Sequence, residues 1–369
     1  MNKKSKVILL PCNSYREELV YESLELGLEL LGGIEGIIDK NESILLKPNL
    51  LKKAEVDKAV ITHPTVVGMF ARLMREKGYQ DIVLADSCGN GTTSKVIHGT
   101  GMDTYLEKFD IPAIDYTKGI HVENPKGIQA KEFVLPKELL DSDCVISLCK
   151  MKTHALERIT GAVKNSYGFV YGFHKAKGHT LYPSADSFAR MLVDLNQYVK
   201  PRLYIMDGIV AMEGNGPGSG EPAPMNVMLM SQDPVALDSV FCHLIHLKPE
   251  MVPTNYHGEK MGLGTWKEEE IEILTPNGPI TMGNATAQYG NPYFDVDRRV
   301  ARSGMWERLA KALNIFQKKP YIQPDKCIRC GICVKSCPVP EKAVNFRTVP
   351  MLLLLPDTYS RGGYADEIL

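Results

Sequence analysis

The sequence predicts an α/β domain, built on a largely parallel sheet flanked by helices and followed by a small C-terminal module. Three observations support this prediction. Short β-rich runs alternate with longer amphipathic segments as far as residue 245. Polar or glycine residues follow most of these β-rich runs directly. Four cysteines cluster in CIRCGICVKSCP at 327–338, after a polar segment with two prolines at 317–326.

The first half of the chain predicts three strands alternating with two helices. The first helical segment is amphipathic and closes on two glycines, and Gly78 follows the second one at the position of a C-cap. The expected strands are 7–10, 44–46 and 82–85, and the expected helices are 15–33 and 64–77.

The second half continues the same alternation. A small β excursion then follows at 267–281, and a helix at 298–316 leads out of the domain. The expected strands are 144–148, 203–206 and 226–230, and the expected helices are 184–199 and 234–245.

The composition excludes some classes of protein. With 369 residues and 44% hydrophobic residues, the chain can bury a sizeable core. Its 43 Lys and Arg residues nearly balance its 44 Asp and Glu residues, so no general attraction to nucleic acid or to anionic membranes is expected. Any binding of anions must therefore be local.

The apolar runs are short. Those at 7–10 and 351–355 have four and five residues, whereas about 20 are needed to span a bilayer. We therefore expect a soluble, cytoplasmic protein without membrane insertion. In that compartment the cysteines outside the cluster are expected to be reduced structural thiols, namely Cys12, Cys88, Cys144, Cys149 and Cys242.

Polar side chains follow the predicted strands at their carboxyl ends. In an open parallel sheet these ends meet at one edge, where ligands bind. The following residues are therefore expected to share a crevice: Lys47 and Asn49, Asp86, Lys150, Lys152 and His154, Asp207, and Ser231 with Asp233. Asp233 is equally a candidate cap for the helix that follows it.

The segment 150–168 has the highest density of basic residues. It is expected to lead into a helix on which Thr160 and Lys164 share one face, with Asn165 beside them. Lysines at such an entrance would bind a phosphate or a carboxylate, and burial would shift their pKa. A solvated basic face is the alternative.

The segment 207–224 is expected to be a loop rich in glycine and proline. In it Asp207, Glu213 and Glu221 would either ligate a divalent cation or act as acid and base. Its glycine spacing is not that of a dinucleotide-binding loop, and GNGTTSK at 89–95 lacks the residues of a phosphate-binding P-loop. A metal site at His174 and His179 is a further alternative.

The cysteine cluster predicts a small ferredoxin-like iron–sulfur module. Its spacing, C-x2-C-x2-C-x3-C-P, presents thiolates to a 4Fe-4S cluster, and zinc is the rival metal. The expected boundaries are 1–316 for the α/β domain, 317–345 for the cassette and 346–369 for an atypical tail. The expected ligands are Cys327, Cys330, Cys333 and Cys337.

Several blocks resemble the iron–sulfur proteins of domain of unknown function family 362. They are KPN at 47–49, CKMKTHALERITGAVKNSYG at 149–168, DGIVAMEGNGPGSGEP at 207–222 and DPVALDS at 233–239, followed by the cassette. The resemblance extends to about Val344 and is most specific at 150–168. It implies two clusters, a redox role and a polar crevice, without a substrate.

The chain departs from that family at its tail, because no cysteine follows Cys337. Three interpretations stay open. The tail is truncated or altered and the cluster pair is not built, or a single cluster takes Cys337 or a remote thiol such as Cys149 as its fourth ligand. In the third, one iron stays open to water or substrate.

Three functions fit these features. The first is a redox enzyme in which the 4Fe-4S cluster, with an electron donor or acceptor protein as partner, delivers single electrons to an anionic small molecule. The second is an electron carrier or cluster-bearing adaptor, and the third is a phosphate- or nucleotide-dependent enzyme with a structural cluster. For the redox enzyme the expected catalytic residues are Lys150, Lys152, His154, Lys164, Asp207 and Glu213, and the expected substrate-binding residues are Lys47, Asn49, Asp86, Asn165 and Asp233.

Overall fold

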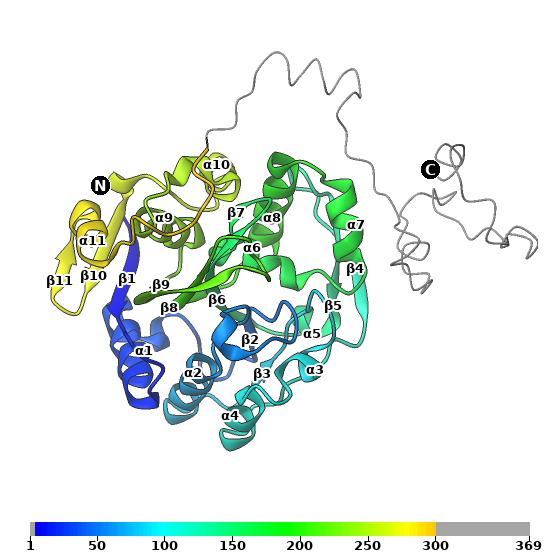
Figure 1. The fold of residues 1–369 in the computed structure, drawn as a ribbon. Helices are drawn as coiled ribbons and strands as arrows, with labels where there is room; N and C mark the ends of the chain where they lie inside the picture. Colours follow the sequence, from blue (N-terminus) through cyan, green and yellow to red (C-terminus); the bar gives the residue numbers. More distant parts are fainter. Residues whose placement is uncertain (1–3, 300–369) are drawn as a thin grey trace, which may run out of the picture. The chain divides into compact units, whose positions relative to one another are not determined.

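A nine-stranded sheet forms the centre of the α/β domain in the computed structural model, which describes residues 4–299 (Figure 1). Its strands lie in the order β11-β10-β1-β9-β8-β6-β2-β3, and the short β7 pairs with β6. They are β1 (Ser5–Pro11), β2 (Ile44–Pro48), β3 (Ile82–Leu84), β6 (Cys144–His154), β7 (Arg158–Ile159), β8 (Leu203–Glu213), β9 (Glu221–Ser231), β10 (Ile271–Thr275) and β11 (Gly278–Ile280).

Six of these nine strands point in the same direction. β3, β2, β6 and β8 form a continuous parallel block. β9 then runs antiparallel to both β8 and β1, so β1 and its parallel neighbour β10 share the direction of that block. The prediction of a largely parallel sheet flanked by helices is confirmed.

Helices cover both faces of the sheet (Figure 1). Ile8 and Leu46 point to one face, where α1, α2 and α4 pack. Their neighbours Val7 and Leu45 point to the other face, against α6, α8 and α9, as the period of two along a strand requires. The described helices are α1 (Glu17–Leu31), α2 (Pro64–Glu76), α3 (Thr93–Ile97), α4 (Met102–Lys108), α5 (Lys137–Leu140), α6 (Gly161–Asn165), α7 (His174–Leu181), α8 (Ala185–Val199), α9 (Pro234–Leu244), α10 (Pro253–Lys260) and α11 (Met282–Tyr289).

A second, two-stranded sheet joins β4 (Gly119–Glu123) to β5 (Glu132–Pro136). The described residues 4–175 and 182–298 belong to one compact unit. None of the described helices combines the length and the apolar surface that crossing a bilayer requires. The predicted helix at 298–316 and the predicted domain boundaries fall at or beyond the end of the described residues.

The strand β6 is longer than the sequence pattern predicted. It continues through the lysine-rich segment to His154, and only Gly161–Asn165 is α-helical in the block expected to form a helix. Pairing with β8 extends β6, because β8 continues alongside it beyond a register shift between Lys150 and Lys152. Lys150 and Lys152 therefore project from a strand and not from a helix entrance.

The glycine-rich segment 207–224 is mostly strand as well, so the prediction of a long loop was wrong. β8 continues to Glu213 and β9 begins at Glu221, which leaves only seven residues between them. The two strands pair antiparallel through a register shift between Gly208 and Val210, and such a bulge accommodates glycine.

Candidate functional site

The carboxyl ends of β2, β3 and β6 and the middle of β8 bring six predicted site residues together at one edge of the sheet. These are Lys47, Asn49, Asp86, Lys150, Lys152 and Asp207, and every one of them is buried. Asn165 joins them from the end of α6, because its side chain bonds to both Lys47 and Asn49. The rule that polar site residues follow the carboxyl ends of parallel strands, here called the strand-end rule, therefore located these residues from the sequence. We call them the lysine cluster.

Lys47 and Asp86 form a buried ion pair across the two outer strands β2 and β3. The Lys47 Nζ atom lies 2.9 Å from Asp86 Oδ1, and the other carboxylate oxygen accepts a hydrogen bond from the Leu50 N–H at 2.8 Å. Gly168 lies directly against this pair, since a Cβ atom there would come within 2.1 Å of Asp86 Oδ1. Glycine at 168 is thus what lets the chain after α6 approach the pair.

A chain of hydrogen bonds joins Asn165, Asn49 and Lys152. The Asn49 amide donates to Asn165 Oδ1 at 2.9 Å, and its own oxygen accepts from Lys152 Nζ at 2.8 Å. Lys152 also donates to the carbonyl oxygens of Val60 and Pro217, at 2.8 and 3.2 Å. Three acceptors match the three N–H donors of an ammonium group, so main-chain and amide dipoles hold this charge in place of a carboxylate.

Burial nevertheless lowers the pKa of Lys152 well below its ordinary value, with Lys164 and Lys150 adding repulsion. The three oxygen acceptors oppose that shift because they favour the charged form. A bound anion would act in the same sense as the acceptors. The arrangement is therefore predisposed to bind negative charge.

Lys150 and Asp207 form a second buried ion pair, between β6 and β8. Their Nζ and Oδ2 atoms are 2.6 Å apart, and Tyr15 donates to the other carboxylate oxygen at 2.8 Å. The main-chain N–H of His63 donates to Asp207 Oδ2 at 3.0 Å. The imidazole ring of His63 stacks on the ring of Tyr15, with the ring centroids 3.5 Å apart. Burial lowers the pKa of His63 to about 4, so the ring is neutral near pH 7.

Lys164 differs from the other lysines of the site. It is only partly buried, and within the described residues no hydrogen bond or ion pair holds its ammonium group. Burial and the nearby charges of Lys175 and Lys47 lower its pKa to about 8. Lys164 is therefore a cation that a ligand could reach.

The carboxylate of Asp238, on α9, fixes the start of α6. It accepts hydrogen bonds from the N–H groups of Ala162 and Val163 at 2.6 and 3.0 Å. Gly161 has φ +53, and a Cβ atom there would lie 2.1 Å from the same carboxylate. Only glycine makes both the left-handed conformation and this close approach easy, and Lys164 is positioned as a result.

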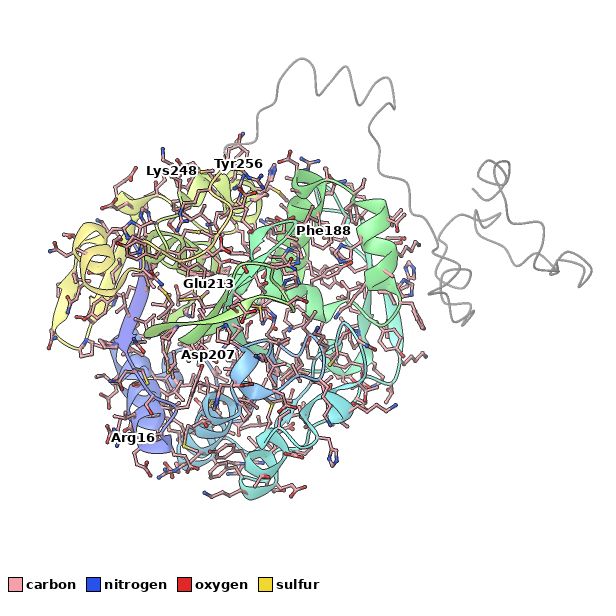
Figure 2. The ribbon with its side chains drawn as sticks, viewed as in Figure 1. Arg16, Phe188, Asp207, Glu213, Lys248 and Tyr256 are labelled. Carbon is pink, nitrogen blue, oxygen red and sulfur yellow. The ribbon has the colours of Figure 1, made fainter. Side chains whose placement is uncertain are left out.

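Two predicted site residues, His154 and Glu213, have other roles in the structure. His154 accepts hydrogen bonds at Nδ1 from the N–H groups of Leu156 and Glu157, at 3.3 and 3.2 Å, and so shapes the turn between β6 and β7. Glu213 lies further along β8 than Asp207 (Figure 2), and its carboxylate accepts from the Asp295 N–H at 2.9 Å. Neither contact places its side chain among the lysines.

The prediction that Asp233 shares this crevice was wrong, because β9 runs antiparallel and ends at the opposite edge of the sheet. Asp233 caps α9 there, accepting from the N–H groups of Val235 and Ala236 at 2.9 and 3.0 Å. It also accepts from the Ser5 hydroxyl at 2.6 Å. Its role in the structure is to hold the start of α9.

Sequence reasoning missed Tyr15, His63 and Glu157. The strand-end rule would have found Tyr15 if it had been applied to the first strand, which is followed by PCNSY. His63 carries a weak signal as the residue before Pro64, at the N-cap of α2. Glu157 carries none, because its burial depends on how the β6–β7 hairpin packs.

The expected divalent cation finds no support in the described part of the chain, where no group of three or more His, Cys, Asp and Glu residues could hold a metal ion. The five cysteines outside the cassette are free thiols. Cys149 is fully buried on β6, and burial raises the pKa of its thiol. It is therefore badly placed to be a remote cluster ligand.

The four predicted cluster ligands lie outside the described residues. Their chemistry fits the cofactor, since four thiolates are the ligand set of a 4Fe-4S cluster. Residues 318–339 match the model of a 4Fe-4S binding domain.

Residues 44–243 match the model of a domain of unknown function (DUF362). A thylakoid-associated protein of Synechocystis sp. is 36% identical over 279 residues, which are 75% of this chain and 86% of that relative.

Two solved structures are more distant. The lactate racemase apoprotein from Thermoanaerobacterium thermosaccharolyticum has a TM-score of 0.44 and 11% identity, over 64% of this chain and 56% of its own. A structural-genomics protein from Thermotoga maritima has a TM-score of 0.36 and 12% identity, over 59% of this chain and 56% of its own. This chain thus spans little more than half the length of either.

Proposed function

Since this chain belongs to the DUF362 family and carries a 4Fe-4S binding domain, we propose that it is an iron–sulfur redox enzyme. In this proposal the cluster, when bound, supplies single electrons at low potential. The α/β domain holds the acceptor, an anionic substrate or cofactor, beside the lysine cluster and Lys164.

The observation that carries the proposal is the excess of positive charge at the site. Two carboxylates, those of Asp86 and Asp207, are each within 3 Å of one lysine, which leaves Lys152 and Lys164 without an ion-pair partner among the described residues. Charged groups taken from water need compensation. An anionic ligand would supply it, and Lys164 is the partner that such a ligand could reach.

The other residues of the cluster position the site in this proposal. The Lys47–Asp86 and Lys150–Asp207 pairs tie neighbouring strands together, and Lys152 joins three separate segments. These ion pairs and hydrogen bonds pre-organise the binding site for its ligand. Lys164 then orients the anion and favours the added electron electrostatically.

A comparison of Lys164→Met with Lys95→Met tests the proposal. Lys95 is an exposed lysine on α3, so its variant controls for the loss of one positive charge. The full chain is purified without oxygen, reduced with dithionite, and mixed with a panel of small carboxylates and phosphate esters while cluster absorbance is followed. Iron and sulfide are measured in each preparation.

We expect at least one anion to reoxidise the cluster in the wild type and in Lys95→Met. In Lys164→Met the rate should fall by at least about 100-fold at unchanged iron content, since the loss of one preorganised donor to a developing charge costs about 3 kcal/mol. Equal rates in the two variants would instead support a cluster-bearing adaptor. Stabilisation by ATP with magnesium, without reoxidation, would support the nucleotide enzyme.

The location in the cytoplasm stays a prediction. The name of the Synechocystis relative makes the surface of a membrane the other location to test. Fractionation of cells that express the tagged full chain separates the two. A small redox protein as electron donor is likewise a proposal, which a pull-down from an anaerobic extract would test.

A further inference from the structure

Four buried polar atoms in the segment 153–160 have no hydrogen-bond partner within the described residues. They are Thr153 Oγ1, the two carboxyl oxygens of Glu157 and Thr160 Oγ1. Glu157 and Thr160 are 0% exposed, and Thr153 is 3% exposed. About 90% or more of buried polar groups in folded proteins are satisfied, so this concentration in one short segment requires an explanation.

The fold places these groups in the β6–β7 hairpin and at the start of α6. Thr153 pairs with Ile159 across the β6–β7 hairpin, and Glu157 lies in the turn of that hairpin. The Thr160 N–H donates to the Lys152 carbonyl at 2.8 Å, which joins the hairpin to the start of α6. Thr160 is the N-cap residue of α6, and Lys164 lies within that same short helix.

The charges of Glu157 and Lys164 act on each other, although no direct ion pair joins the two groups. Burial raises the pKa of Glu157 to about 8, and Lys164 opposes that rise. Near pH 7 Glu157 therefore holds its proton and offers an O–H donor. Together with the threonine hydroxyls and the Lys164 ammonium, every group without a partner can donate a hydrogen bond.

We propose that Glu157, Thr160 and Lys164 form a binding site for a small oxyanion, whose oxygens accept hydrogen bonds from these three side chains. The site rests on the proposed function and narrows its ligand to a compact carboxylate or phosphate-type anion. With one ammonium and one neutral acid, it favours a single negative charge. A ligand that presents only donors would leave the Lys164 ammonium and the Glu157 O–H without an acceptor.

Binding of an anion at this site requires both Glu157 and Lys164 to be protonated. Above pH 8 Glu157 loses its proton and repels an anion, while Lys164 loses its charge. The apparent affinity scales with the fraction of each group that is protonated. Each group therefore lowers the affinity about 10-fold at pH 9 relative to pH 7. The other charged groups that act on these two are Asp186 for Glu157, and Lys175, Lys47, Lys152 and Asp86 for Lys164.

Calorimetry on the full chain, purified without oxygen, tests this site. The probes are acetate, oxalate and inorganic phosphate, titrated at pH 7 and at pH 9. The proteins are the wild type, Glu157→Gln, Thr160→Val and Lys95→Met, with thermal unfolding and iron content as checks of integrity. Comparison of acetate and oxalate with phosphate identifies the class of oxyanion.

We expect at least one probe to bind at pH 7, and its affinity to fall about 100-fold at pH 9 in the wild type. In Glu157→Gln the fall should be only about 10-fold, since the amide stays neutral and Lys164 alone titrates. Thr160→Val should weaken binding about 10-fold or more at pH 7, because a hydrogen bond to a charged ligand is lost. Lys95→Met should match the wild type at both pH values.

Two results would overturn the inference. One is the absence of binding by all three probes at pH 7, in which case buried water satisfies these atoms. The other is the same pH dependence in the wild type and in Glu157→Gln. Neither result decides the proposed redox function, because reoxidation of the cluster by a larger anion is measured separately on Lys164→Met.

Discussion

Glu157→Gln should remove a pH-dependent loss of stability from the α/β domain. In the folded chain burial raises the pKa of Glu157 from 4.5 to about 8. Between these values the folded chain keeps a proton that the unfolded chain has released. The contribution of Glu157 to stability is therefore fully present below pH 4.5 and is lost as the pH rises towards 8.

The magnitude follows from the size of the shift. At about 1.4 kcal/mol per pH unit, a shift from 4.5 to about 8 corresponds to about 5 kcal/mol in total. About 3.5 kcal/mol of this lies between pH 5 and pH 8, because titration is incomplete at both ends. Glutamine does not titrate, so the variant should lack this part of the decline.

Urea unfolding of the full chain, followed by far-UV circular dichroism at pH 5 and pH 8, measures the difference. Glu107→Gln is the matched control, since Glu107 is an exposed glutamate on α4. The quantity of interest is the change in unfolding free energy from pH 5 to pH 8, wild type minus variant. The slope of unfolding free energy against urea should be the same in all three proteins.

A wild-type decline that exceeds that of Glu157→Gln by about 3 kcal/mol or more would support the reasoning. An equal decline in both proteins would refute it, because Glu157 would then titrate alike in the folded and unfolded chains. The absolute stability at one pH is less informative. A buried glutamine amide without a partner itself costs about 1–3 kcal/mol.

Three further outcomes are expected. Gly168→Ala should destabilise the domain by about 1–3 kcal/mol in the same urea assay, because the new Cβ atom would meet the Asp86 carboxylate; an unchanged midpoint would contradict this. Asp207→Asn should cost about 3–5 kcal/mol at pH 7, since it leaves a buried lysine unpaired, and a loss below 1 kcal/mol would argue against a charged pair. Cys337→Ala should lower the iron content and abolish the reduced-cluster signal in electron paramagnetic resonance. Cys149→Ala should leave both unchanged, because Cys149 is fully buried. Loss of iron in Cys149→Ala would instead make Cys149 a cluster ligand.

Much of the fold could be predicted because its signals are local. The helix expected at 184–199 is observed at Ala185–Val199, where Ser184 and Ser187 form a capping box. The helix expected at 64–77 begins at Pro64, which fits the first turn of a helix. In both, periodic apolar residues and a defined start lie within one stretch of sequence.

The strand lengths and the direction of β9 could not be predicted in the same way. A strand ends where its partner stops pairing, and the partners of β6 and β8 are distant in sequence. The rule that polar residues gather at carboxyl ends succeeded for Lys47, Asp86 and Asp207, whose strands are parallel. It failed for Asp233, because the rule depends on strand direction and a single strand carries no signal of direction.

The sequence by itself determined the α/β class, the cysteine spacing of the cassette and the lysines of the lysine cluster. Each of these features depends on residues that lie close together along the chain. Only the tertiary structure decided which lysines are neutralised by carboxylates, and that Glu157 is buried without a hydrogen-bond partner. The physical reason is that ion pairing and desolvation depend on distances between segments, which the fold sets and the local sequence does not.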